Sequence, residues 1–351
     1  MRAFSVLGDK KAGWLDKERP LCGPMDAVLR PLCLAVCTSD VHWVEDGNDR
    51  RRGITLGHEG VGEIVEVGGC VRDFKRGDVV IVPAITPDWS HVASQGGNAV
   101  HSGRMFGGFT FSAKGGIFAE FFHVNDADGN LAHLPDGMDA CVGAMVSDMM
   151  PTGFNGAELA QIEFGDTVCV IGIGPVGLMA VRAAVLMGAA RVFGVGTREN
   201  CVSVAKEYGA TDILSYKDGP LDRQILEMTG KKGVDKVIIA GGNNDTFIEA
   251  VKMVRPGGKI GNVNFLDDGE FIKIPRLAWG LGMGNKQING GLTPGGRLRM
   301  EKMAALVLYG RVDPSRLITH RFEGLDALPQ MLALMRDKPA ELIKAVTVIK
   351  W

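Results

Sequence analysis

Apolar residues in the second half of the chain form short unbroken runs that alternate with longer amphipathic stretches. The runs at 167–171, 191–195 and 235–240 are rich in Val and Ile and are separated by stretches with helical periodicity. Such strands, joined by helices, are typical of a parallel sheet that is covered on both faces. The pattern predicts a doubly wound α/β domain with strands at 167–171, 191–195, 212–214, 235–240, 259–264 and 287–292 and helices at 175–187, 201–208, 221–228 and 245–254.

The first 150 or so residues follow a different pattern. Short apolar runs such as 61–67 and 79–83 are interrupted by Gly, Pro and Asp, which favours a β-rich domain of irregular, barrel-like form. The segment after Thr293 predicts helices at 300–309 and 328–336 and a strand at 345–349. Because it is too short for its own core, we expect it to pack on the first domain. The predicted domains are 1–151 with 293–351, and 152–292.

Composition and charge narrow the class of protein. The chain has 351 residues, of which 46% are hydrophobic and 23% charged, as in ordinary globular proteins of two domains. The net charge of −2 gives no attraction for nucleic acid, and Arg50-Arg51-Arg52 is interpreted as a solvated loop. No apolar run has the ~20 residues that span a bilayer, and the N-terminus lacks a signal-peptide pattern. We expect a cytoplasmic protein without nucleic-acid or membrane partners.

The cysteines predict a reducing environment. Their number, seven, is odd, and their spacing shows no paired framework. We therefore expect reduced thiols, most of them small buried or partly buried apolar residues, among them Cys33, Cys70, Cys141, Cys169 and Cys201.

A glycine-rich turn follows the first strand of the doubly wound domain. Gly172, Gly174 and Gly177, with Pro175 and Val176 between the last two, make a G-x-G-x-x-G that opens a helix. The first Gly allows the tight turn, the second admits a pyrophosphate, and the third lets helix and strand pack closely. The helix N-terminus then offers N–H groups to phosphates. This context predicts a dinucleotide site rather than a merely structural turn.

The end of the second strand indicates which dinucleotide is bound. NAD-selective domains place Asp or Glu there to bind the ribose hydroxyls, whereas this chain has Gly196, Thr197 and Arg198. A hydroxyl and a guanidinium can bind a 2′-phosphate, so NADP(H) is predicted. In the alternative, Arg198 faces solvent beside Glu199.

Three places in the sequence offer metal ligands. Cys37, the pair His58-Glu59 and Asp148 are residue types found in catalytic zinc sites, which keep one position open for water or substrate. Each has a plain alternative when it is taken alone. Cys37 could be a small core residue, and Asp148 could cap a helix.

The residues around these ligands resemble a known family. Gly57-His58-Glu59-Gly60-Val61-Gly62, followed by Gly68 and Val71, together with 37–42, is similar to the zinc-containing alcohol dehydrogenase signature of the medium-chain dehydrogenase/reductase family. The similarity continues over 86–89, 122–128, 147–150, 153–154, 156–158, 208–213, 290–292 and 294–299, and so covers essentially the whole chain. It is greatest to NADP-dependent secondary-alcohol dehydrogenases of anaerobic bacteria and protists. It implies a GroES-like β-rich catalytic domain plus a Rossmann-type domain.

The resemblance also implies roles for the candidate ligands. Cys37, His58 and Asp148 would bind one zinc ion per chain, with Glu59 as an exchangeable fourth ligand. Ser39 would accept the alcohol proton, and His42 would extend the path to solvent. A zinc ion acts as a Lewis acid that lets an alcohol ionise near neutral pH, and a nearby hydroxyl can relay the proton. The structural zinc lobe of many relatives is not expected, because no cysteine lies between Cys70 and Cys141.

Further site residues are implied by the same resemblance. Tyr216 would join the 2′-phosphate site and stack near the adenine. An apolar substrate pocket would be lined by Ala84, Ile85, Phe109, Phe265 and Leu292, with Met283 reaching in from a neighbouring subunit of a homotetramer. Such a pocket suits small ketones and secondary alcohols. The chain departs from the family pattern at Phe109, Phe265, Pro151, Asn155 and Asn285, which leaves the width and polarity of the pocket open.

Two other functions remain open at this point. The first is a zinc-dependent dehydrogenase of another substrate, namely a polyol, threonine or an aldehyde. The second is an NADP(H)-binding protein without catalysis. The joint presence of Cys37, Ser39, His58 and Asp148 argues against the second, because a non-catalytic protein has no chemical need for all four.

Overall fold

The chain divides into two compact units. The computed structural model describes residues 1–102, 115–266 and 269–351. The first unit combines Met1–Pro151 with Pro294–Trp351, and the second comprises Thr152–Thr293. Phe109, a predicted pocket residue, lies outside the described residues. Within the described ranges, none of the helices has the length and the apolar composition needed to span a membrane.

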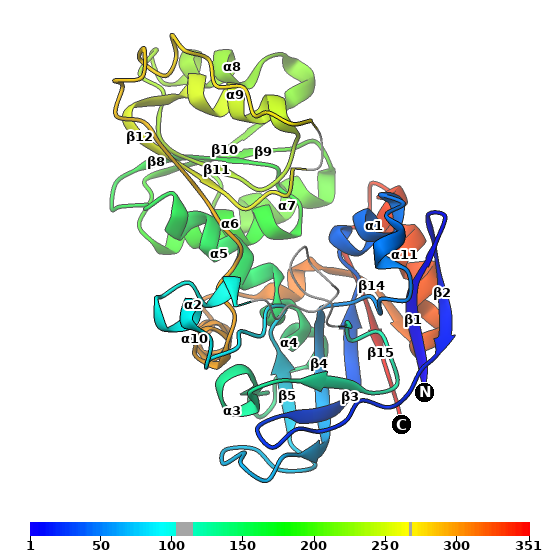
Figure 1. The fold of residues 1–351 in the computed structure, drawn as a ribbon. Helices are drawn as coiled ribbons and strands as arrows, with labels where there is room; N and C mark the ends of the chain where they lie inside the picture. Colours follow the sequence, from blue (N-terminus) through cyan, green and yellow to red (C-terminus); the bar gives the residue numbers. More distant parts are fainter. Residues whose placement is uncertain (103–114, 267–268) are drawn as a thin grey trace. The chain divides into compact units, whose positions relative to one another are not determined.

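The first unit is built on a seven-stranded sheet of order β14-β15-β3-β4-β5-β7, with β6 paired to β3 (Figure 1). A separate antiparallel hairpin is formed by β1 and β2. The strands are β1 (Arg2–Gly8), β2 (Lys11–Asp16), β3 (Ala27–Ala35), β4 (Glu59–Val67), β5 (Val79–Val82), β6 (Phe122–Val124), β7 (Ala132–His133), β14 (Ile318–Glu323) and β15 (Lys344–Val348). The helices are α1 (Thr38–Glu45), α2 (Val92–Gln95), α3 (Ala127–Asn130), α4 (Ala140–Ser147), α10 (Arg297–Leu308) and α11 (Leu328–Asp337), and α5 (Met149–Leu159) continues into the second unit.

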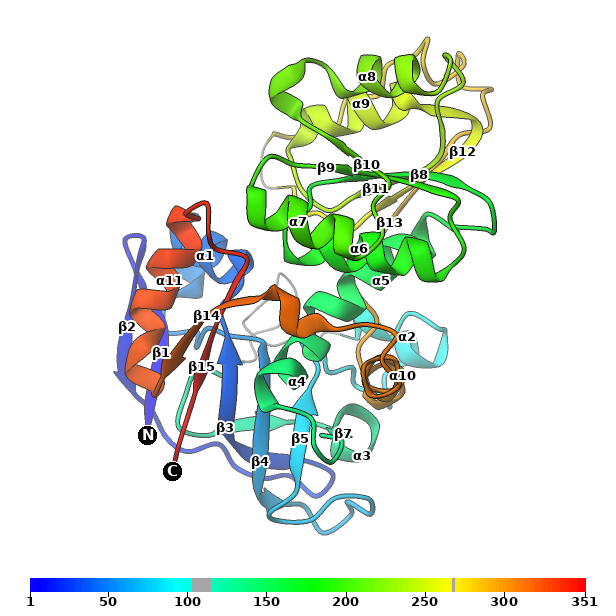
Figure 2. The same ribbon diagram turned by 180° about the vertical axis from the view of Figure 1, so that it is seen from behind.

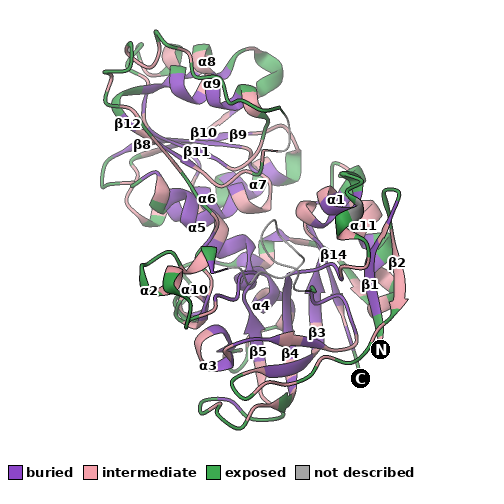
Figure 3. Cartoon of the chain, viewed as in Figure 1, coloured by how far each residue is buried: buried purple, intermediate pink, exposed green. Residues whose placement is uncertain are grey.

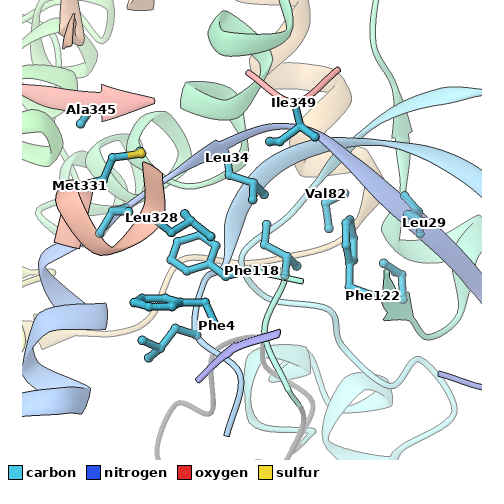
Figure 4. Packing of buried hydrophobic residues seen from close by; sticks show 14 of the residues in the cluster. Phe4, Leu29, Leu34, Val82, Phe118, Phe122, Leu328, Met331, Ala345 and Ile349 are labelled. Carbon is cyan, nitrogen blue, oxygen red and sulfur yellow. The ribbon is translucent and has the colours of Figure 1, made fainter. Parts of the chain in front are cut away.

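The burial of the strands follows their position in this sheet. β3 lies between β15 and β4, and seven of its nine residues are buried, whereas β14 at the edge alternates between half-buried and exposed positions (Figure 3). The core gathers side chains from both ends of the chain, including Phe4, Leu34, Phe118, Leu328 and Ile349 (Figure 4). Because β15 pairs with β3, the C-terminal segment completes the sheet of the first unit, as predicted.

The second unit is a six-stranded parallel sheet of order β10-β9-β8-β11-β12-β13. Helices α6 and α7 cover one face of this sheet and α8 and α9 the other (Figure 2). The strand order reverses between β8 and β11, the point at which ligands bind in open α/β sheets. The strands are β8 (Thr167–Ile171), β9 (Arg191–Val195), β10 (Asp212–Leu214), β11 (Val234–Ile239), β12 (Val254–Asn262) and β13 (Gln287–Gly290), and the helices are α6 (Pro175–Leu186), α7 (Glu199–Glu207), α8 (Leu221–Met228) and α9 (Asn244–Met253).

The cysteines agree with the expectation with one exception. All seven are free, and Cys33, Cys141, Cys169 and Cys201 are buried. Cys70 is exposed, so the expectation that it would be buried or partly buried is wrong. It lies in the turn after β4, outside the strands of the sheet.

Two glycines offer a matched test of packing beside His58. Gly57 and Gly77 have φ values of 92° and 93°, in the left-handed region. A Cβ atom at Gly57 would overlap the ring of Phe118, whereas one at Gly77 would meet nothing within 4 Å. We expect Gly77→Ala to cost about 1–2 kcal/mol of strain. Gly57→Ala should cost a further ~1–3 kcal/mol through overpacking, measured by urea unfolding. Equal losses in the two variants would contradict this packing.

Candidate functional site

The candidate zinc ligands come from three separate places in the first unit. Cys37 is the N-cap of α1, two residues after the end of β3. His58 and Glu59 lie at the start of β4, and Asp148 lies between α4 and α5. β3 and β4 are antiparallel neighbours, and Ala35 pairs with Glu59, so the end of one strand and the start of the other meet. The topology thereby brings Cys37 to the His-Glu pair.

The four side chains converge on a single point. Cys37, His58, Glu59 and Asp148 each offer a ligand atom, and these atoms all lie within 4.8 Å of one another. His58 Nε2 lies 3.5 Å from Asp148 Oδ2 and 3.8 Å from Glu59 Oε1. Ser39 Oγ is 3.3 Å from the same His58 nitrogen. The structure therefore brings the predicted proton acceptor to the edge of the ligand cluster.

Asp40 fixes two of the ligands and was not predicted as a site residue. Its carboxylate accepts a hydrogen bond from Cys37 N at 2.9 Å and another from Gly57 N at 3.0 Å. Asp40 Oδ1 also lies 3.5 Å from His58 Nδ1. A carboxylate on the second ring nitrogen orients a ligand histidine and leaves Nε2 for the metal. The sequence could have indicated Asp40 as a site residue, because it lies only three residues after the candidate ligand Cys37 in the motif 37–42.

Lys344 is the second residue that the sequence did not reveal. It is the first residue of β15 and is fully buried, and its Nζ donates to Glu59 Oε1 at 2.6 Å. The same nitrogen lies 3.5 Å from Met149 Sδ. No hydrogen bond to Glu59 Oε2 is found among the described residues, although this atom is buried. One oxygen of Glu59 is thus held by Lys344, while the other has unused acceptor capacity.

Burial and mutual charge shift the titration of these groups. Burial raises the pKa of Glu59 to about 7, the charge of Lys344 opposes this, and Asp148 adds to it. Burial alone would lower the pKa of His58, but the charge of Asp40 and hydrogen bonds to Asp148, Asp40 and Cys37 raise that pKa well above its usual value. Burial likewise opposes the charge on Lys344, and Glu59 nevertheless raises the pKa of its ammonium group. The cluster is a buried set of charged groups in which Lys344 and His58 offset the repulsion between Glu59 and Asp148.

These residues fit a zinc ion. Sulfur, imidazole nitrogen and carboxylate oxygen are the donor types found in catalytic zinc sites. They are grouped within 4.8 Å of one another, and Glu59 Oε2 is a buried acceptor without a hydrogen-bond donor among the described residues. An oxygen of this kind costs free energy unless a cation or a donor satisfies it.

The glycine-rich turn of the second unit has the geometry of a phosphate-binding loop. Gly172 has φ of 88°, and a Cβ there would lie 2.8 Å from Gly241 Cα. A Cβ at Gly177 would overlap the carbonyl of Gly172, so only glycine allows α6 to approach β8 this closely. At Gly174 the space is open except for the Arg198 guanidinium 3.8 Å away. Pro175 and Val176 form the first turn of α6.

The predicted 2′-phosphate residues cluster beside this turn. Gly196 and Thr197 follow β9, and Arg198 is the N-cap of α7. Thr197 Oγ1 and Tyr216 OH lie 3.0 Å apart, so the two hydroxyls share a hydrogen bond. Tyr216 is 59% exposed, which leaves its ring surface accessible to a planar ligand. The structure brings Thr197 and Tyr216 together and places Arg198 next to the glycine-rich turn.

The predicted pocket residues are divided between the two units. Ala84 and Ile85 are buried and follow β5 in the first unit. Phe265 and Leu292 belong to the second unit, where Phe265 is exposed. Asn155 Nδ2 donates to the carbonyl oxygens of Gly291 at 3.3 Å and Leu292 at 3.2 Å. Asn155, which departs from the family pattern, therefore holds the chain in place at Leu292, one of the predicted pocket residues. Met283 is 79% exposed.

Both units match known protein families. Residues 23–136 match the alcohol dehydrogenase GroES-like domain, and residues 175–308 match the zinc-binding dehydrogenase family. An NADP-dependent isopropanol dehydrogenase of Thermoanaerobacter brockii is 57% identical over 99% of this chain and 100% of its own length. A protein of the same description from Entamoeba histolytica is also 57% identical, over 100% of this chain and 96% of its own.

Solved structures agree with this assignment. The alcohol dehydrogenase of Thermus sp. ATN1 superposes with a TM-score of 0.88 at 27% sequence identity, over all of both chains. The fold is therefore the predicted combination of a GroES-like domain and a doubly wound Rossmann-type domain. Two family matches, full-length relatives and the structural likeness agree, and the chain belongs to the zinc-containing alcohol dehydrogenases of the medium-chain dehydrogenase/reductase family.

Proposed function

We propose that the protein is a zinc-dependent, NADP(H)-linked dehydrogenase that interconverts small secondary alcohols and ketones. The observation that carries this proposal is the buried cluster of Cys37, His58, Glu59 and Asp148 with Ser39 at its edge. Relatives with 57% identity over the full length are NADP-dependent isopropanol dehydrogenases, which supports the same substrate class.

Cys37, His58 and Asp148 would hold the zinc ion, and Glu59 would be the exchangeable fourth ligand. A bound zinc ion supplies a Lewis acid that lowers the pKa of a neighbouring hydroxyl group. Asp40 keeps His58 Nε2 directed into the cluster, since its carboxylate lies beside Nδ1. Lys344 holds Glu59 Oε1, so that this carboxylate can withdraw from the cluster without leaving a buried charge unpaired.

The proton of the alcohol leaves through α1. Ser39 Oγ accepts it, because this hydroxyl lies beside the ligand cluster. His42 lies three residues farther along the same helix and is partly exposed, so it shares a helix face with Ser39 and can pass the proton toward solvent. Both residues belong to one rigid element whose N-terminus carries Cys37.

The second unit supplies the nucleotide site. The cradle left by Gly172, Gly174 and Gly177 fits a pyrophosphate at the N-terminus of α6. Thr197, Arg198 and Tyr216 would bind the 2′-phosphate, and Gly196 keeps the backbone close to it. We further propose a cytoplasmic homotetramer in which Ala84 and Ile85 line the substrate pocket and Met283 reaches it from a neighbouring subunit.

The substrate class can be tested by initial rates. The purified protein should contain about one zinc ion per chain. It should reduce NADP with 2-propanol much faster than with sorbitol or threonine, as followed by NADPH absorbance. Removal of the metal with a chelator should abolish the rate, and added zinc should restore it. A faster rate with sorbitol or threonine would show that the substrate is a polyol or threonine and not a small secondary alcohol. Nucleotide binding without zinc or turnover would indicate a non-catalytic protein.

The ligand set can be tested at Asp148. Asp148→Asn removes an anionic donor, so zinc affinity should fall at least roughly 10- to 100-fold and turnover should fall with it. Zinc content after dialysis and the rate with 2-propanol are the measurements. Asp136→Asn changes an exposed carboxylate in the same unit and serves as the control. Full zinc occupancy with normal turnover in Asp148→Asn would remove Asp148 from the ligand set.

Cofactor choice can be tested at Arg198. A guanidinium–phosphate hydrogen bond contributes about 1.5–3 kcal/mol. Arg198→Ala should therefore raise the KM for NADP by roughly 10- to 100-fold. The KM for NAD should change little, because that cofactor has no 2′-phosphate. Lys206→Ala, an exposed change on the same helix, is the matched control. Equal losses for both cofactors would show that Arg198 does not bind the 2′-phosphate.

A further inference from the structure

Two cysteines outside the zinc cluster lie in direct contact. Cys33 Sγ donates a hydrogen bond to Cys141 Sγ at a sulfur–sulfur distance of 3.0 Å. Cys33 belongs to β3 and Cys141 to α4, and they are 108 positions apart in the sequence. Both residues are at most 1% exposed. The contact is therefore made by packing of a helix on a sheet, and neither residue has a role in the proposed catalytic cycle.

The surroundings of Cys141 favour its thiolate form. It lies in the first turn of α4, where the N-cap Asp139 accepts a hydrogen bond from Cys141 N at 2.9 Å. Helix N-termini stabilise a thiolate. The hydrogen bond from Cys33 lowers the pKa of Cys141, against the opposing effects of burial and of the Asp139 carboxylate, and the same contact raises the pKa of Cys33 well above its usual value. Cys141 is thus the more acidic thiol of the pair, and Cys33 keeps its proton and donates the hydrogen bond.

An exposed ion pair lies next to the first turn of α4, close in sequence to Cys141. Asp139 forms an ion pair with Arg321 of β14 at 3.6 Å, and the two side chains are 54% and 51% exposed. Cys141 follows Asp139 by two residues and its charge state is influenced by both partners of this ion pair. Displacement of exposed side chains costs little free energy, because exposed ion pairs contribute only ~0–1 kcal/mol. Reaction at Cys141 requires that their displacement admit a molecule as small as hydrogen peroxide to the first turn of α4.

We propose that Cys33 and Cys141 form a redox-active pair that hydrogen peroxide converts into a reversible disulfide. In the first step the Cys141 sulfur attacks peroxide, so that an S–O bond forms, the O–O bond breaks and one water leaves. In the second step the Cys33 sulfur attacks the sulfenic acid at Cys141, so that the S–S bond forms, the S–O bond breaks and a second water leaves. Two thiols are oxidised and one peroxide is reduced to two waters.

The disulfide would connect the two elements that immediately precede zinc ligands in the chain. Cys33 lies four residues before Cys37, and Cys141 lies seven residues before Asp148. A bond between β3 and α4 would limit how far these two ligands can separate. It also closes a long loop, which reduces the conformational freedom of the unfolded chain. The oxidised protein should therefore unfold at a higher temperature and, if the proposed function holds, release zinc more slowly.

Peptide mapping under non-reducing conditions tests the pair directly. The zinc-loaded protein is treated with graded hydrogen peroxide, digested and compared with and without a dithiol. The wild type should show a dithiol-sensitive link between the Cys33 and Cys141 peptides. Cys33→Ser should stop at a sulfenic acid on Cys141 that dimedone labels, and Cys141→Ser should leave Cys33 unmodified. Cys70→Ser removes an exposed thiol and should form the link as the wild type does.

Several results would overturn the proposal. The proposed redox role is refuted if Cys33 and Cys141 both stay reduced at peroxide doses that fully oxidise the exposed Cys70. It is also refuted if Cys33 forms a disulfide with another cysteine. The linked protein should gain several degrees in melting temperature and lose zinc to a chelator several-fold more slowly, and Cys33→Ser should show neither change. A link without either change would refute its role in holding β3 to α4. Because the link is scored by mass, its absence is distinguishable from a failure of the zinc or dehydrogenase assays.

Discussion

The buried ion pair between Lys344 and Glu59 is the interaction on which the first unit depends. Both side chains are fully buried, and removal of one partner of such a pair leaves a charge that costs about 3–5 kcal/mol. With zinc bound, the thiolate of Cys37 and the carboxylates of Glu59 and Asp148 exceed the ion's charge by one. The ammonium group of Lys344 balances that excess. Lys344 therefore offsets the excess negative charge of the ligand set within a buried site.

This requirement explains why the first unit is assembled from both ends of the chain. Lys344 and Glu59 are 285 positions apart, and they meet because β15 adds to the sheet beside β3 while β4 lies on the other side. A catalytic domain that ended before the nucleotide-binding unit would have the ligands Cys37, His58 and Asp148 but no cation beside Glu59. The return of the C-terminal segment is thus an electrostatic necessity as well as a packing one.

The sequence predicted what depends on local patterns and missed what depends on pairing across the sheet. The boundaries of β8, β9, β10 and α8 were predicted to the residue, because short apolar strands and amphipathic helices have a recognisable spacing of apolar residues. The glycines of the nucleotide turn were recognised because their spacing reflects backbone geometry. Lys344 was not recognised, since a lysine in an apolar strand gives no sign of the carboxylate that it will meet. The contact between Cys33 and Cys141 was missed for the same reason, because it depends on how α4 lies against β3.

The two units therefore differ in how their chemistry is encoded. The candidate nucleotide site is local, since the glycine-rich turn, Arg198 and Tyr216 fall within 172–216 and need only one strand–helix repeat and its neighbour. The candidate zinc site is non-local, since Cys37, Glu59, Asp148 and Lys344 come from four separate segments. Its geometry exists only once the sheet and α4 are packed, and the same packing brings Cys33 to Cys141. The packing of α4 on the sheet therefore determines metal affinity, charge balance and thiol chemistry in the first unit. The preference for a 2′-phosphate depends on residues of the second unit alone.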